Sequence, residues 1–104
     1  MEESQFNLAV DETLEAIEQA LEHCDADIDW DLAGGILSIV CSNGTQIIVN
    51  RQGPSRQIWV ASRSGGYHFD YNAADDRWRQ DGLELFDLLS QALTDQCGEP
   101  VVLR

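Results

Sequence analysis

The stretch between Ser42 and Tyr71 constrains the fold of this chain more than any other, because its pattern is typical of consecutive antiparallel strands. Asn43-Gly44 directly follows the apolar run 36–41, and this dipeptide favours a type I′ turn, in which both central residues have positive φ. The loop 51–55 and the pair Gly65-Gly66 are typical of later reversals. We therefore predict a meander with strands at 36–41, 46–50, 57–62 and 67–71.

Alternation within these strands separates two faces, of which only one has to meet a core in an antiparallel sheet. Ile58 and Val60 alternate with Trp59, and Phe69 follows His68 in the next strand. With the aliphatic set on the core side, Trp59 becomes an outward-facing tryptophan among polar residues, which indicates a recognition surface. The residues that we expect on the outer face are Ile48, Trp59 and His68.

Charge excludes some classes of partner. The chain has 19 acidic and 6 basic residues, for a formal net charge of −13, so binding to a nucleic-acid backbone or an anionic membrane is not expected. Eleven of the acids precede residue 32, and the first basic residue is Arg51. The N-terminal segment has neither a basic leader nor a long apolar run, so we expect no targeting peptide and no membrane span.

Cysteine spacing predicts a reducing environment. Cys24, Cys41 and Cys97 are odd in number, far apart in sequence and without a C-x-x-C pair. This spacing predicts neither a disulfide framework nor a thiolate zinc site, and it favours a cytoplasmic location.

The first third of the chain is predicted to be an amphipathic helix. Apolar residues recur with a period of 3.6 from Phe6 to Cys24, with Ser4 as the expected N-cap. Four acids occupy one flank beside the apolar stripe, and we expect no Lys or Arg to relieve their repulsion. A solvated, solubilising face is the plain explanation of this pattern. The four acids are Asp11, Glu15, Glu18 and Glu22.

The segment 25–32 changes its period from 3.6 to 2. Ile28, Trp30 and Leu32 alternate with aspartates, which predicts a short strand with one core face and one anionic face. Aspartate is a poor strand former, but an edge strand tolerates it, and edge charge discourages aggregation.

The last third completes an α+β pattern. A brief strand at 77–79 precedes a second amphipathic helix, for which Asp81 and Glu84 resemble a capping box and Gly98 an end. The apolar tail 101–103 is expected to cover the groove between the helices. We predict one domain over residues 1–104, a two-layer sandwich with two helices packed on one face of an antiparallel sheet of about six strands.

Several residue groups together resemble the frataxin family in its short bacterial form, and the resemblance covers essentially the whole chain. They are the acidic first helix and strand, Asn50, Gln52, Pro54, Gln57 and Trp59, the run Gly65-Gly66-Tyr67-His68-Phe69, and Leu85, Leu88 and Leu89. The resemblance implies a role in iron–sulfur cluster assembly, with weakly bound iron and regulation of the complex of cysteine desulfurase and scaffold protein. It also implies a protein that is monomeric without metal and that could assemble into oligomers when iron is bound.

Carried onto this chain, the resemblance implies two sets of site residues and no catalytic residue. Asn50, Gln52, Gln57 and Trp59 would bind the partner proteins. Independently of the resemblance, the outward-facing position of His68 beside Asp70 makes it a candidate secondary metal position. Metal would bind to what we call the acidic ridge, which comprises Glu15, Glu18, Glu22, Asp25, Asp27, Asp29 and Asp31.

Other functions fit parts of the same pattern. Carboxylates are hard ligands that take ferrous or ferric iron but also other di- or trivalent cations, so weak, partly hydrated and multiple sites are expected. An acidic decoy that binds a basic protein without metal would use the same charges. Iron oxidation by the ridge is the enzymatic alternative, although no hydrolase, metalloprotease, phosphate-loop or dinucleotide motif occurs, and we predict that the chain is not an enzyme.

Overall fold

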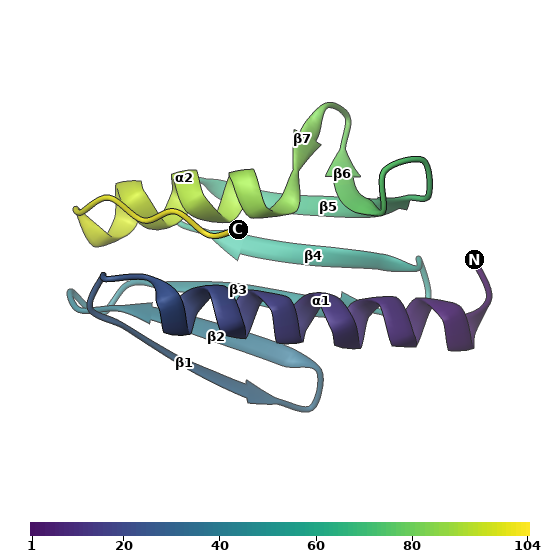
Figure 1. The fold of residues 1–104 in the computed structure, drawn as a ribbon, viewed down its shortest axis with the longest axis horizontal. Coiled ribbons are helices and arrows are strands. Elements are labelled where there is room, and N and C mark those ends of the chain that lie inside the picture. Colours follow the sequence, from purple (N-terminus) through teal and green to yellow (C-terminus); the bar gives the residue numbers. More distant parts are fainter.

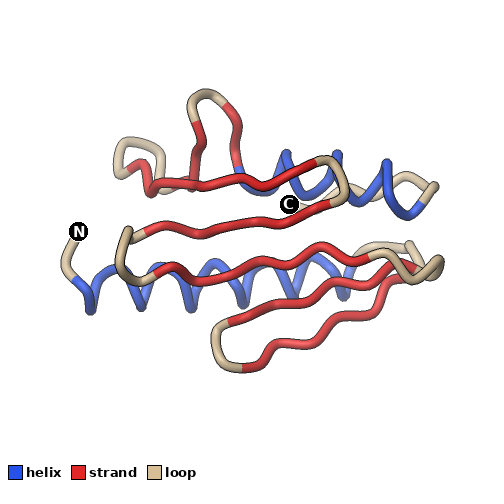
Figure 2. The backbone as a smooth tube through the Cα atoms, turned by 180° about the vertical axis from the view of Figure 1, so that it is seen from behind, coloured by secondary structure: helices blue, strands red, loops and turns tan.

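A computed structural model describes residues 1–104 and has two layers, a seven-stranded antiparallel sheet and two helices on one of its faces (Figure 1). The strands follow one another across the sheet in chain order, so every strand pairs with its sequence neighbour. The opposite face of the sheet carries no helix (Figure 2). The elements in chain order are α1 (Glu3–His23), β1 (Ile28–Ala33), β2 (Ile36–Cys41), β3 (Gln46–Gln52), β4 (Gln57–Ser62), β5 (Gly65–Asn72), β6 (Arg77–Gln80), β7 (Leu83–Glu84) and α2 (Leu85–Cys97).

The predicted α+β sandwich is confirmed, with one strand more than expected. β7 is two residues long and pairs back onto β6 through Arg79 and Gln80. A segment of two residues has no periodicity to read, which is why the sequence pattern missed it. Neither helix is long and apolar enough to cross a membrane.

Two of the predicted turns have a different geometry. Only Gly44 has positive φ in the β2–β3 turn, at 86°, and its N–H donates to the Cys41 carbonyl at 2.9 Å, so the turn is not type I′. This geometry matches a type I turn closed by a left-handed glycine, the common form of a longer hairpin loop. At the next hairpin, Ser62 pairs with Gly65, so Arg63 and Ser64 make the reversal and both glycines belong to β5.

Both predicted N-caps are wrong, whereas the predicted end of α2 at Gly98 is confirmed. α1 is preceded by Glu2 rather than Ser4, and the Glu2 N–H donates to Gln5 Oε1 at 3.2 Å. At α2, the Glu84 carboxylate accepts from the N–H groups of Phe86 and Asp87, at 2.9 and 3.1 Å. Asp81 lies in the β6–β7 turn with φ of 55°, too early in the chain to cap α2.

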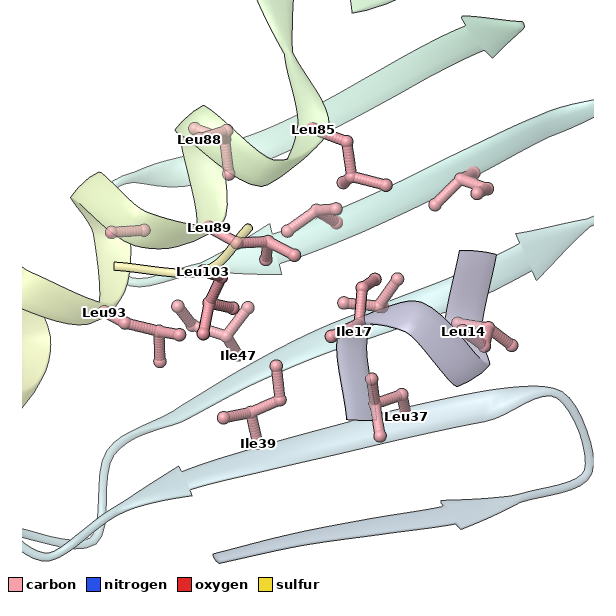
Figure 3. Packing of buried hydrophobic residues seen from close by; sticks show 14 of the residues in the cluster. Leu14, Ile17, Leu37, Ile39, Ile47, Leu85, Leu88, Leu89, Leu93 and Leu103 are labelled. Atoms are coloured by element: carbon pink, nitrogen blue, oxygen red, sulfur yellow. The ribbon is translucent and has the colours of Figure 1, made fainter. Parts of the chain in front are cut away.

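The core lies between the helices and the sheet and contains 22 buried residues (Figure 3). The α1 stripe of Phe6, Val10, Leu14, Ile17 and Leu21 is buried as its spacing predicted. The tail also behaves as predicted, because Val101 and Leu103 are each 3% exposed. Hydroxyls of Thr94 and Ser90 accept from the N–H groups of these two residues, at 3.0 and 2.8 Å, and so hold the tail against α2.

The expectation of no disulfide is wrong. Cys41 and Cys97 are bonded to each other, and Cys24 is free. The two bonded residues are 56 positions apart in sequence, but they are the last residues of β2 and α2. The meander and the direction of α2 bring these two ends together, which spacing in the sequence could not reveal.

Candidate functional site

The acids of α1 border a groove on the helix side of the molecule. The groove has a volume of about 470 Å³ and lies between α1 and the β1–β2 turn. Arg51 of β3 reaches its edge, where it pairs with Asp11 and donates to Asn7 Oδ1 at 2.8 Å. The expectation that no basic residue relieves the acids is therefore wrong at Asp11. The residues that line the groove are Asp11, Leu14, Glu15, Glu18, Leu32, Gly35 and Arg51.

The acids of β1 lie on the other side of the sheet. Ile28 is buried and Trp30 packs against the core, so Asp29 and Asp31, which alternate with them, are on the outer face. Asp29 is opposite Val40 of β2 across the strand pair. Leu32, which was predicted on the core face of this strand, is 38% exposed, so the core does not extend to the end of β1. β1 is an edge strand, so the acidic ridge wraps around this edge of the sheet instead of converging on one point.

The ridge therefore supplies carboxylates without a ready-made chelate. All seven ridge residues are exposed except Glu18, which is half-buried. No group of three or more His, Cys, Asp or Glu side chains is arranged to hold one metal ion. The ion pairs that do form involve Asp11, Asp75 and Glu84, and none involves a ridge residue. Hard cations would meet one or two carboxylates at a time and keep part of their water.

Acidic residues also surround Tyr71, near the N-terminal half of α1. The Tyr71 hydroxyl donates to Asp76 Oδ1 at 2.6 Å. This hydrogen bond, followed by desolvation and by the charges of Asp76, Glu12 and Asp75, raises the pKa of Tyr71 above its ordinary value. Three acids from two segments, α1 and the β5–β6 turn, thus act on one phenol.

Trp59 lies on the outer face of β4, as predicted, within an ordered group of side chains. Its indole stacks on the His68 ring with the centroids 4.2 Å apart and the planes 12° from parallel. Its Nε1 donates to Gln57 Oε1 at 2.7 Å, and Gln57 Nε2 donates to Asp70 Oδ1 at 3.0 Å. Trp59 is half-buried by these contacts. The group presents a flat aromatic surface with a fixed orientation.

The remaining predicted partner-binding residues surround this group. Asn50 of β3 is opposite Trp59, and Gln52 is opposite Gln57. His68, predicted as a secondary metal position, is the stacking partner of Trp59 in this structure. Asp70 also belongs to this group, although the sequence pattern assigned it no role there. The cross-strand register, which pairs Gln57 with Asp70 and Trp59 with His68, is the feature that identifies it.

Comparisons with known proteins agree over the full length of the chain. Residues 1–99 match the family described as Frataxin-like domain. The chain is 45% identical to the iron-sulfur cluster assembly protein CyaY of Tolumonas auensis, covering 99% of both chains. It is also 45% identical to the protein of the same name from Dechloromonas aromatica, over 100% of both.

Solved structures show the same likeness. Frataxin from Psychromonas ingrahamii superimposes with a TM-score of 0.90 at 35% identity, covering 100% of this chain and 99% of that one. Yeast frataxin has a TM-score of 0.65 at 24% identity, over 88% of this chain and 80% of that one, which is a likeness of fold.

Proposed function

The chain belongs to the frataxin-like family, and on this basis we propose that it acts in iron–sulfur cluster assembly. In this role it donates or senses iron and regulates the complex of a cysteine desulfurase and its scaffold protein. The names of its relatives support the assembly role. We propose the cytoplasm as its location and a monomer as its metal-free state, with oligomers forming where iron links the ridges of different copies.

The observation that supports this function most directly is that acids of β1 and the Trp59 group lie on the same face of the sheet. Asp29 and Asp31 of β1 lie on the same uncovered sheet face as Trp59 of β4. Three strand spacings separate β1 from β4, which is about 14 Å across the strands at roughly 4.8 Å per strand. Asp31 and Asp29 are displaced a further two and four residues along β1 from Ala33, the residue in line with Trp59. One partner protein can therefore contact the charges and the aromatic group together. The charges would accelerate association, and the indole would hold the complex.

Iron would be cargo at the ridge. Carboxylate oxygens suit ferric and ferrous iron and also other hard cations, and their spread around the edge strand favours release over tight retention. Weak binding at several positions is the behaviour that a donor or sensor needs. The secondary position at His68 would be weaker still, because its ring is already stacked on Trp59.

The test is a titration with Co²⁺, a lanthanide or iron while backbone amide signals are recorded. We expect signals between residues 15 and 31 to shift or broaden first. The double variants Glu18→Gln with Glu22→Gln, and Asp29→Asn with Asp31→Asn, should each weaken binding by a factor of roughly three to ten, because exposed charge contacts are worth about 1 kcal/mol. Asp87→Asn with Asp95→Asn removes the same charge from α2 and should change the affinity less than about twofold.

Two results would contradict distributed binding at the ridge. One is the loss of all binding on a single substitution, and the other is broadening around His68 that spares the ridge. The enzymatic alternative has its own signature, which is oxygen consumption with ferrous iron far beyond the amount of protein present. We expect binding without efficient turnover.

A further inference from the structure

All three cysteines lie at the same end of the molecule. Cys24 is the C-cap of α1, Cys41 ends β2 and Cys97 ends α2. Figure 1 shows these three element ends together on the left of the view. The disulfide between Cys41 and Cys97 ties the helix layer to the sheet at this end. Cys24 remains a free thiol nearby in the fold.

Polar contacts hold this end independently of the disulfide. Gln96 is 4% exposed, its Oε1 accepts from the Arg63 N–H at 2.8 Å, and its Nε2 donates to the Gln46 carbonyl at 3.2 Å. Asn43 Nδ2 donates to the Gln96 carbonyl at 2.6 Å. Two hairpin turns are thereby attached to the last turn of α2. The disulfide can open without leaving α2 detached, because these hydrogen bonds remain.

The two sulfur-bearing residues differ in exposure. Cys41 is 2% exposed, whereas Cys97 is half-buried and is followed by the exposed Gly98. Cys97 is thus the more exposed residue of the pair, so a small thiolate from solution would attack at Cys97, with Cys41 as the leaving group. Disulfides with an accessible sulfur are the ones that exchange, and those found in reducing compartments are mostly redox-responsive.

We propose that Cys41 and Cys97 form a site of reversible thiol–disulfide modification that sets the stability of this end of the molecule. A low-molecular-weight thiol such as glutathione attacks Cys97 and forms a mixed disulfide, and Cys41 leaves as a thiol. A second glutathione then attacks the glutathione sulfur of the mixed disulfide and releases Cys97. The products are glutathione disulfide and two cysteine thiols. Oxidation by glutathione disulfide runs the same steps backwards and returns two electrons to glutathione.

Opening the Cys41–Cys97 disulfide would also affect the start of β1. Cys41 is opposite Ile28, the first residue of β1, which lies between Asp27 and Asp29. The closed pair fixes the β2 end on which this strand begins. The modification would thus loosen both the last turn of α2 and the beginning of β1, far from the N-terminal half of α1.

The experiment compares the intact protein in glutathione buffers of varied reduced-to-oxidised ratio. Thiol titration should count one free thiol at the oxidised extreme and three at the reduced extreme. The Tm should fall by about 10 to 25 °C on reduction, because removing a cross-link of this span restores the freedom of the unfolded chain. Amide exchange at residues 42–45 and 96–98 should accelerate by at least about tenfold, and more than in the first half of α1.

Two variants separate the pair from the free cysteine. Cys24→Ser should keep the full Tm response, whereas Cys41→Ala with Cys97→Ala should show the Tm of the reduced protein and no response. If that double variant does not fold, the wild-type comparison still decides. Three free thiols in glutathione disulfide, a pair that stays closed at every ratio, or an unchanged Tm on reduction would each overturn the proposal.

Discussion

At the scale of single residues, the outer-face group around Trp59 shows how far pattern reasoning extends. Alternation along β4 was enough to place Trp59 outward, because side chains on a strand change face at every residue. The stack on His68 and the hydrogen bond to Gln57 depend on the register between β4 and β5. That register follows from a two-residue reversal at Arg63-Ser64, which the neighbouring glycines obscured in the sequence.

The residue-scale prediction concerns Trp59→Ala. Loss of the stacked ring on a solvated face should lower the free energy of unfolding by only about 1 kcal/mol. Binding to the proposed partner, the cysteine desulfurase of the same organism, should weaken at least roughly tenfold, as expected for an interface anchor. Calorimetric titration and a denaturant melt measure the two effects. Tyr71→Ala removes a half-buried aromatic residue outside the Trp59 group and should leave affinity unchanged.

Opposite results would move Trp59 to another role. Extensive unfolding with unchanged affinity per folded molecule would make it a structural residue. Unchanged affinity with unchanged stability would favour an acidic decoy that binds through charge alone.

At the scale of elements, helix ends were harder to predict than helix existence. Apolar periodicity identified both helices, and the strands 36–41 and 57–62 have the predicted bounds. The cap of α2 was misassigned because a two-residue strand separates Asp81 from the helix. Glu84 is both the last residue of that strand and the cap, and its burial leaves it 6% exposed. A glutamate is a less usual cap than aspartate, so composition pointed to the wrong acid.

The element-scale prediction follows from this assignment. Glu84→Ala should lower the free energy of unfolding by about 1 to 2 kcal/mol, since it leaves two N–H groups at the start of α2 without their acceptor. Glu84→Gln keeps an acceptor oxygen and should cost less. Asp81→Asn preserves the tolerance for positive φ and should change stability by less than about 0.5 kcal/mol. Urea melts of the three variants provide the comparison, and a larger loss at Asp81 than at Glu84 would restore the sequence-based cap.

At the scale of the whole molecule, long-range proximity escaped prediction. The fold class followed from local patterns, because a meander keeps sequence neighbours adjacent in the sheet. The Cys41–Cys97 bond and the Arg51–Asp11 pair join residues 56 and 40 positions apart, and no local pattern marks them. Periodicity predicted the carboxylates of the acidic ridge on one helix flank and one strand face, but only the fold shows that the sheet edge separates these two groups.

The last prediction concerns the cost of a net charge of −13. Asp27 and Asp29 are exposed and form no ion pair, so they contribute repulsion to the folded state. Raising the ionic strength from about 0.01 M to about 0.15 M shortens the Debye length from about 30 Å to about 8 Å and should raise the Tm. Replacing both residues with Asn should stabilise the metal-free protein at low salt by about 0.5 kcal/mol, and this gain should shrink as salt is added.

Asp75→Asn is the control, because Asp75 accepts from Arg79 Nε at 2.8 Å and pairs with its guanidinium. It lowers the negative charge by one unit but also breaks an ion pair, so it should give no stabilisation at any salt concentration. Thermal melts across the salt series measure all three proteins. If Asp27→Asn with Asp29→Asn lowered the Tm at low salt, these carboxylates would have to make structural hydrogen bonds, and repulsion within the ridge would not be what limits stability. A multivalent cation should have the same effect as salt on the wild type at far lower concentration, because it binds the folded ridge and not the separated charges of the unfolded chain.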